Sequence, residues 1–449
     1  MSLRYGLFTI LGCLFFSVIN AQQVNDSGQV HFFSIQQCVD FAQKNNLQVK
    51  NAITDLQEQE QVNRGITSAA LPNISANASV IDYLKIPTNL LPGEFFGQPP
   101  GTFIPVKFGT QYNANASLQL QQIVFDGQVF VGLQARKTSI DFFTKSIDVV
   151  LENVKSNVYK VYYQLVASKT QIQQLKDNIE LLEKLKHDAN ELFKNGFAEK
   201  LDVDKTEVQL TNLQTQKQSV ENQVANGYLG LKLLIGMPIK DSLILTDSIT
   251  DENIKEGLLN EGVYDYKNRV EYQYAELGRR LNEYNIKRYK LSALPKLSLT
   301  GDYTKNAQRS KFDIFGKGDW FTTAYVGLNL NVSIFDGNFR RSNLAKAKID
   351  LQKSEDQIDF LKLNIDKEVA EATNNFRNAI LTLDNQKRNI ELAQKVYEQS
   401  KKKYEVGTGS TTEITTAQTD LRDAQNNYIN ALYTAILAKV DYLKAVGKL

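Results

Sequence analysis

Residue types that commonly carry enzyme chemistry are scarce in this chain, which has two histidines and two cysteines among 449 residues. His31 and His187 lack a serine, cysteine or metal-ligating partner at a spacing that suits a nucleophilic triad or a zinc site. Gly407-Thr408-Gly409 follows a predicted helix rather than a strand, so it does not match a phosphate-binding loop. We therefore predict no enzymatic activity, no cofactor and no metal site.

Both cysteines lie in apolar stretches of the sequence. Cys38 lies in an apolar helical pattern, where a buried small hydrophobic residue is expected rather than a nucleophile. Cys13 ends a segment that faintly resembles a lipobox, but apolar residues follow it where a polar tether is expected. Arg4 followed by about 15 largely apolar residues and Ala21 predicts instead a signal peptide over residues 1–21, which is shorter than the ~20 residues of a spanning helix. A lipidated Cys13 is the alternative.

Charge and proline content narrow the class of protein further. The chain has 52 basic and 50 acidic residues, a net charge of +2, which gives no electrostatic footprint for nucleic acid. Only 8 residues are proline, so very long helices are possible. After residue 21 no stretch is long and apolar enough for a transmembrane helix.

Short segments of the first half recur in the second half at a nearly constant offset. Val124-Phe125-Asp126-Gly127 recurs as Ile334-Phe335-Asp336-Gly337, 210 residues later. Phe193-Lys194-Asn195-Gly196 recurs as Tyr404-Glu405-Val406-Gly407, 211 residues later. Self-similarity at a fixed spacing indicates an internal two-fold repeat.

Each repeat is predicted to hold two strands and two long helices. The first repeat, residues 22–240, has strands at about 73–83 and 112–124 and helices at about 133–194 and 200–235. The second repeat, residues 241–449, has strands at about 296–304 and 322–335 and helices at about 343–405 and 411–446.

The strands have one apolar and one polar face. From Thr323 to Ile334, for example, every second residue is apolar, and residues 73–80 alternate in the same way. Strands of ~10 residues with this alternation suit a membrane β-barrel with lipid outside and water inside. A soluble sheet packed on a core is the alternative, but the chain offers no second amphipathic layer to cover four such strands.

The loops between paired strands are long and aromatic. Residues 84–112 hold five of the eight prolines and four phenylalanines, and residues 304–322 hold Trp320 and three more phenylalanines among basic residues. These loops fit the outer side of a barrel, where loops are longer, and they fit ordinary loop packing equally well.

The helices carry narrow apolar seams. From Leu151 to Leu182 apolar residues step by alternating three and four positions, which is the heptad pattern of a coiled coil. The segment from Leu344 to Ile365 repeats it, and Gly196 and Gly407 mark the turns into returning helices. Each repeat is therefore predicted to form an antiparallel helical hairpin.

Four strands cannot close a barrel, and open strand edges do not persist in lipid. The chain must therefore contribute strands to an oligomer, which is a dimer, a trimer or a tetramer on this argument alone. The helices have polar faces that exclude lipid, so they project into water. A barrel joined to a helical tube forms a conduit, and a solid helical stalk is the alternative.

The order of these elements resembles the outer-membrane factor (TolC) family of outer-membrane efflux proteins. The segments that carry the resemblance are residues 34–46, Asn268-Arg269-Val270-Glu271-Tyr272 and Tyr404-Glu405-Val406-Gly407-Thr408, and the match spans about residues 33 to 447. The resemblance implies a mixed α/β membrane protein: a homotrimer with a twelve-stranded β-barrel, four strands per chain, continuous with a long α-helical coiled-coil barrel.

The resemblance also implies a function, partners and a location. The protein is expected to be a channel-tunnel in the cell outer membrane, with its helical part in the periplasm. It would passively conduct substrates from a periplasmic adaptor and an inner-membrane pump of the RND or ABC class. A trimeric, barrel-anchored adhesin is the alternative, although such a protein carries its strands together at the C-terminus.

Two groups of site residues follow from the resemblance. The helix tips that meet the adaptor correspond to Asn195, Gly196, Phe197 and Ala198 and to Val406, Gly407 and Thr408. Glycine lets the chain reverse with positive φ at such a tip. Helix capping alone explains the glycines, but it does not explain Phe197, an aromatic residue at a turn.

The second group is a periplasmic gate. Tyr404 and Asp202 are expected to hold the closed end, with Tyr404 donating a hydrogen bond to Asp202 of the other hairpin, and Glu413 is expected to form an acidic ring. Asp202 and Glu413 also favour helix N-termini whatever else they do. This sequence departs from the family pattern at Gly409, where some relatives have a locking arginine, and at Thr416, a second acidic position. The lock is therefore expected to be looser than in those relatives.

Overall fold

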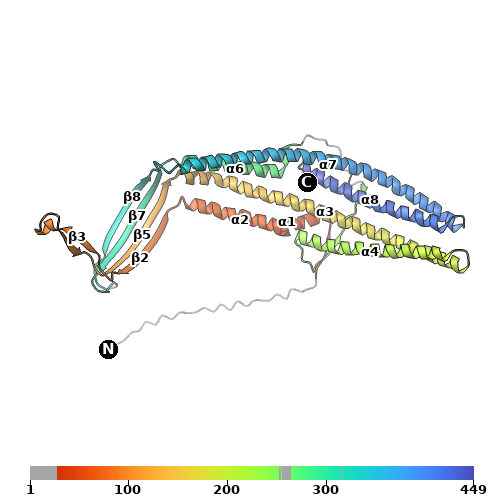
Figure 1. Ribbon diagram of the computed structural model, residues 1–449, viewed down its shortest axis with the longest axis horizontal. Coiled ribbons are helices and arrows are strands. Elements are labelled where there is room, and N and C mark those ends of the chain that lie inside the picture. The colour runs from red at the N-terminus through yellow and green to blue at the C-terminus, as the bar shows by residue number, and fades with distance from the viewer. Residues whose placement is uncertain (1–27, 252–253, 255–263, 315) are drawn as a thin grey trace, which may run out of the picture.

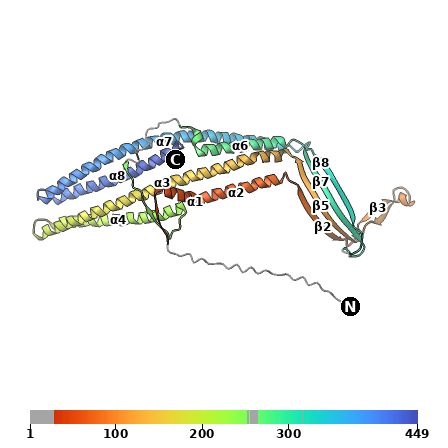
Figure 2. The same cartoon turned by 180° about the vertical axis from the view of Figure 1, so that it is seen from behind.

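The computed structural model describes residues 28–251, 254, 264–314 and 316–449. The expected signal peptide, residues 1–21, lies outside the described residues. A four-stranded sheet lies at one end of an elongated molecule, and two helical hairpins end together at the other end (Figures 1 and 2). In the described part of the chain, none of the helices is apolar over a stretch long enough to cross a membrane.

Four helices form the two hairpins. α3 (Gly127–Lys194) turns into α4 (Lys200–Ile235), and α7 (Phe339–Glu405) turns into α8 (Thr411–Ala445). With 68 residues, α3 is about 100 Å long at the α-helical rise per residue. It begins six residues before the expected start because the Asp126 carboxylate accepts a hydrogen bond from the Gln128 amide at 2.8 Å and caps the helix.

Three shorter helices extend the hairpins toward the sheet. α1 (Ile35–Asn45) and α2 (Leu47–Ser68) precede the first strand of the sheet, and α6 (Val270–Leu291) follows a short 3₁₀ turn, η2 (Tyr266–Asn268). Cys38 on α1 is fully buried in a core with Val158, Tyr162 and Leu231. Burial raises the pKa of the Cys38 thiol to about 12, so this thiol stays protonated and packs as a small hydrophobic side chain, as expected.

The helices lie side by side in four columns. α3 contacts α2 and α4, which follow one another along one flank, and it also contacts α6 and α8, which lie along its other flank. α7 in turn packs against α6 and α8, and both views place it at the opposite edge from α2 and α4 (Figures 1 and 2). The column of α2 and α4 and the column of α7 are therefore the two edges of this layer of helices.

The sheet is antiparallel with the strand order β2-β5-β7-β8. Its strands are β2 (Asn73–Asp82), β5 (Tyr112–Phe125), β7 (Lys296–Arg309) and β8 (Phe321–Asn331). β7 extends five residues beyond the expected strand, because residues 305–309 stay paired with the long β5 strand. β8 ends four residues before the expected end, since its pairing with β7 stops at Lys296.

Two further strand pairs were not expected. β3 (Thr88–Pro92) and β4 (Phe103–Lys107) form a hairpin inside the first aromatic loop, with the 3₁₀ turn η1 (Gly93–Phe96) between them. This hairpin projects beyond the sheet (Figure 1). β1 (Val30–Phe33) pairs in parallel with β6 (Ser242–Leu245) beside the helices.

The buried guanidinium of Arg269 links α6, α7 and α8 at the start of α6. Arg269 is 4 % exposed, and its guanidinium donates hydrogen bonds to Glu271 at 3.1 Å, to Glu368 of α7 at 3.0 Å and to the Ala445 carbonyl of α8 at 2.9 Å. Each bond is assisted by the arginine charge and fixes the start of α6 against α7 and α8. Arg269 belongs to a segment that carries the family resemblance, and the structure gives it this positional role.

Candidate functional site: the sheet faces and the helix tips

The sheet separates its side chains into two chemically different faces. The register pairs Ile74 with Leu120 and Leu299 with Leu328, so apolar side chains of all four strands share one face. On the other face Ser75 is paired with Gln119, and Ser298 with Asn329. The apolar face is open to solvent in the single chain, with Ile74 at 72 % and Leu328 at 69 % exposure. A large exposed apolar surface of this kind marks a contact with lipid or with another protein.

The two turns at the far ends of the hairpins have the same backbone geometry. Gly196 has φ +79° and Gly407 has φ +76°. The amide of Phe197 donates to the Leu192 carbonyl at 2.8 Å, and the amide of Thr408 donates to the Lys403 carbonyl at 2.9 Å. Together with the bonds from the two glycine amides, these contacts form a Schellman motif at each helix end. The positive φ therefore requires glycine here, while a Cβ would meet no atom within 4 Å at either position.

The tips expose apolar side chains. Phe197 is 82 % exposed and Val406 is 73 % exposed, although both lie far from the sheet. Asn195 and Thr408 are also exposed, and Ala198 is half-buried. The structure thus brings the seven expected tip residues to one end of the molecule on two matching turns. Capping explains the glycines, but it gives no reason for an exposed phenylalanine and valine.

The expected gate residues are only partly brought together. The Tyr404 hydroxyl is buried and has no hydrogen-bond partner among the described residues, so the expected bond to Asp202 is not formed within this chain. Burial raises the pKa of Tyr404, the Thr411 side chain close to the hydroxyl acts in the opposite direction, and the negative charges of Asp188 and Asp202 raise the pKa further. The hydroxyl therefore stays protonated and able to donate. A buried donor without a partner is costly, so a small shift that lets the hydroxyl reach a nearby acceptor of its own chain would be favourable.

The acidic residues of the gate occupy the first turns of the returning helices. Asp202 lies in the first turn of α4, and Glu413 lies in the first turn of α8. The Glu413 carboxylate forms a 3.0 Å ion pair with Lys403, and its own amide is capped by the Ser410 hydroxyl at 3.1 Å. Sequence reasoning missed Lys403 as the partner of Glu413, although it precedes Tyr404 directly.

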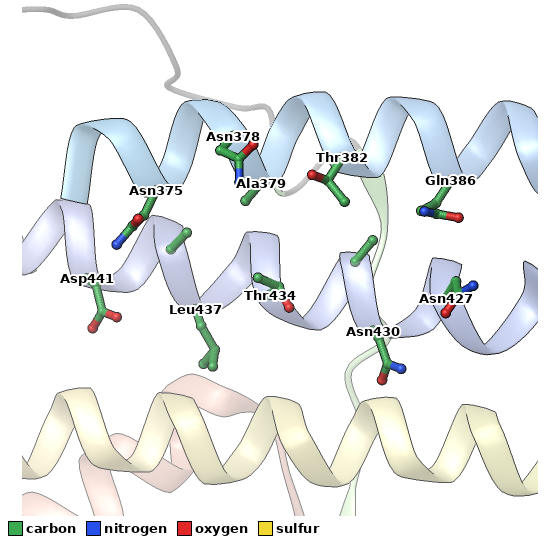
Figure 3. A pocket seen from close by; sticks show the side chains of 12 residues that line it. Asn375, Asn378, Ala379, Thr382, Gln386, Asn427, Asn430, Thr434, Leu437 and Asp441 are labelled. Carbon is green, nitrogen blue, oxygen red and sulfur yellow. The ribbon is translucent and has the colours of Figure 1, made fainter. Parts of the chain in front are cut away.

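A groove between α7 and α8 is lined mainly by uncharged polar residues. Asn375, Asn378, Thr382 and Gln386 come from α7, and Asn427, Asn430 and Thr434 come from α8 (Figure 3). Asp441 lies at one end of the groove and forms a 2.8 Å ion pair with Lys160 of α3. The groove can hydrogen-bond a polar solute or a neighbouring chain, but it offers no combination of groups for catalysis. No pattern in the sequence had singled it out.

Comparisons with known proteins agree with this arrangement. Residues 267–448 match the family model described as "Outer membrane efflux protein". Outer membrane protein TolC of Salmonella enteritidis is 25 % identical over 354 residues, which is 75 % of this chain and 69 % of that protein. Two solved structures share the fold: CusC, at a TM-score of 0.75 and 16 % identity, covering 92 % of this chain and 91 % of CusC, and VceC from Vibrio cholerae, at 0.72 and 12 %, covering 92 % and 96 %.

The fold, with its two-faced sheet and its long helical hairpins, is that of the TolC-like outer-membrane channels. The chain is similar to the TolC family of outer-membrane efflux proteins in both sequence and fold, and it is a protein of the outer membrane. The family resemblance seen in the sequence is thereby confirmed.

Proposed function

We propose that three copies of this chain close into a tube that carries solutes passively from the periplasm to the exterior. In this proposal the four-stranded sheets form a twelve-stranded barrel in the outer membrane, and the helices form a tunnel in the periplasm. One observation supports this proposal above all. The sheet has two outer strands and the layer of helices has two outer columns, and each outer strand lies on the same side of the chain as one outer column. The number three comes from the family resemblance.

The sheet edges support closure between copies. β2 and β8 are the outer strands of the sheet, and among the residues that the structure describes each pairs with one neighbouring strand. Unpaired strand edges are not stable in lipid, because their backbone groups have no hydrogen-bond partner there. Pairing β8 of one copy with β2 of the next removes every edge once the ring closes.

The helix edges support the same closure. On α7 a line of exposed apolar residues runs along the side opposite its buried residues, within about 60° at 3.6 residues per turn. We call this line the α7 stripe: Ile349, Phe360, Leu363, Leu381, Leu392 and Val396, which are 44–67 % exposed. α4 has a corresponding line opposite its buried face, the α4 stripe: Leu201, Val208, Leu229 and Leu233, which are 44–76 % exposed.

These two stripes lie on the two edge columns, so they meet when copies are arranged in a ring. The edge that carries the α7 stripe continues into β8, and the edge that holds α4 also holds α2, which continues into β2. One head-to-tail contact therefore satisfies the strands and the helices together, and repeating it around an axis closes the ring.

Amine-reactive crosslinking of intact outer membranes tests this assembly. The expected product series ends at three copies of the chain. A series that stops at one or two copies, or continues beyond three, would contradict the ring.

The exposed helix tips are the proposed docking site for a periplasmic adaptor, which links the tube to an inner-membrane pump of the RND or ABC class. The support is the pair of matching turns with apolar side chains directed into water. Capture of the adaptor by purified protein, compared between wild type and tip variants, is the measurement.

The gate proposal follows from the unpartnered Tyr404 hydroxyl. We infer that in the closed tube this hydroxyl donates to Asp202 of the other hairpin, whose negative charge already raises the pKa of Tyr404, and that this bond helps to hold the tunnel closed. The Tyr404→Phe variant removes the donor without changing the packing of the ring, so it is expected to raise the open probability or conductance of single channels. An unchanged single-channel record would show that Tyr404 is not part of the gate.

A further inference from the structure

The polar face of the sheet is almost free of charge. Strand alternation and the register assign to this face 24 residues of the four strands, of which only Lys296 and Asp302 are charged. Most of the others carry amides or hydroxyls, such as Asn77 on β2 and Ser117 on β5. In a barrel whose apolar face meets lipid, this polar face lines the water-filled interior.

The two charges are in different situations. Lys296 lies at the end of β7 that joins the helices, where its ammonium group forms a 3.1 Å ion pair with Asp126. Asp302 lies near the middle of β7, paired in register with Gln119 of β5 and Tyr325 of β8. Its carboxylate accepts a hydrogen bond from the Thr304 hydroxyl and forms no ion pair with any residue that the structure describes. Lys305 on the same strand is assigned to the opposite face by alternation.

The helix tips differ from the barrel in how their acidic charge is compensated. Glu413, the acidic residue expected near the periplasmic entrance, is matched by the charge of Lys403 in the same chain. The charge on the wall of the barrel therefore has no such local compensation, whereas the acidic charge at the tip does.

We propose that Asp302 determines the ion preference of the outer-membrane section of the channel. This proposal rests on the proposed function, because only an assembled barrel brings the Asp302 residues of several copies around one lumen. A ring of carboxylates attracts cations and repels anions, and rings of this kind select cations in other channels. The amide and hydroxyl wall around the ring gives uncharged polar solutes no electrostatic barrier.

The effect of the Asp302 carboxylates on ion selectivity depends on salt concentration. At 0.1 M salt the Debye length is ~10 Å, so the field of wall charges extends well into the lumen, whereas at 1 M it is ~3 Å. The preference for cations is therefore expected in dilute electrolyte and is expected to weaken in concentrated electrolyte.

The test is the reversal potential of the full-length protein in planar lipid bilayers under a KCl gradient, with the dilute side at ~0.1 M. Wild type is expected to prefer K⁺ over Cl⁻. Asp302→Asn is expected to reduce the permeability ratio by roughly half or more, and Asp302→Lys is expected to reverse it toward Cl⁻. Asp82→Asn is the matched control, because Asp82 lies on the same sheet but on the opposite face by alternation, and it should keep the wild-type ratio.

Three results would overturn the proposal. A wild-type permeability ratio in Asp302→Asn would show that another group sets the preference, and the channel itself would stand. An equal shift in Asp82→Asn would show that total charge, rather than the position of Asp302, is what matters. If the wild-type protein conducts no current, the proposed channel fails, and the role of Asp302 fails with it.

Discussion

Replacing Leu381 and Leu392 together by aspartate is expected to abolish the crosslinked trimer and leave single chains. Both side chains belong to the α7 stripe and are 65 % and 61 % exposed in the single chain. Burying a leucine side chain contributes roughly 1.5–3 kcal/mol, and each aspartate would instead place a charge in an apolar contact at every interface of the ring. The measurement is amine-reactive crosslinking of outer membranes, with circular dichroism to confirm that the helices remain.

The matched control for this variant lies on another face of α7. Lys348 and Lys402 are both exposed and lie about 90° around the helix from the middle of the α7 stripe. Changing both to glutamine alters the charge by the same amount as the two aspartates. This control is expected to keep the trimer. Loss of the trimer in both variants would point to a general effect of charge, and a trimer that survives in the aspartate variant would contradict the proposed interface.

Phe197→Ser is expected to weaken capture of the adaptor by about 30-fold and to reduce export in cells accordingly. An exposed aromatic side chain that becomes buried at the centre of an interface typically contributes about 2 kcal/mol or more, and each 1.4 kcal/mol corresponds to a tenfold change in affinity. The measurement is adaptor binding by the purified trimer, together with accumulation of an exported compound in cells.

The matched control for the tip is Phe95→Ser. Phe95 is also 82 % exposed, but it lies in η1 within the hairpin beyond the sheet, at the opposite end of the molecule. This control is expected to bind the adaptor as the wild type does. Equal binding by the wild type and Phe197→Ser would exclude the tip phenylalanine from the docking site.

Local patterns in the sequence indicated the elements whose faces differ in polarity. The alternation in residues 73–80 reflects a strand with an apolar and a polar face, and the seam that includes Val154, Val158 and Leu175 marks the buried side of α3. Helix ends were less accessible to this reasoning, because they depend on single capping contacts such as that of Asp126. The β3–β4 hairpin was not predicted, because both of its strands contain proline, which is uncommon in paired strands.

Contacts between distant segments could not be predicted from local periodicity. The parallel pairing of Val30 with Ser242 joins residues 212 positions apart, and no local pattern signals it. The buried position of Arg269 likewise depends on α7 and α8 packing around it. The α7 stripe was not separated from the heptad seam on the opposite side of the same helix, because both contribute apolar residues to one stretch of sequence.

The sequence indicated which residues lie at the helix turns, but it did not indicate which hydrogen bonds and ion pairs they form. The internal repeat and its glycines indicated where both helix tips lie in the sequence. The structure brings the two tips together, with φ values of +79° at Gly196 and +76° at Gly407. The expected bond from Tyr404 to Asp202 is absent within the chain, and Glu413 is paired with Lys403. Side-chain pairing depends on how the two hairpins approach each other, which the family resemblance could not specify for this sequence.

Single-channel recording of the purified protein in planar lipid bilayers tests the central claim most directly. If three copies form a continuous tube, the wild type should produce discrete current steps of uniform size, and Tyr404→Phe should produce larger or longer ones. A folded, membrane-inserted protein that conducts in neither form would contradict the channel.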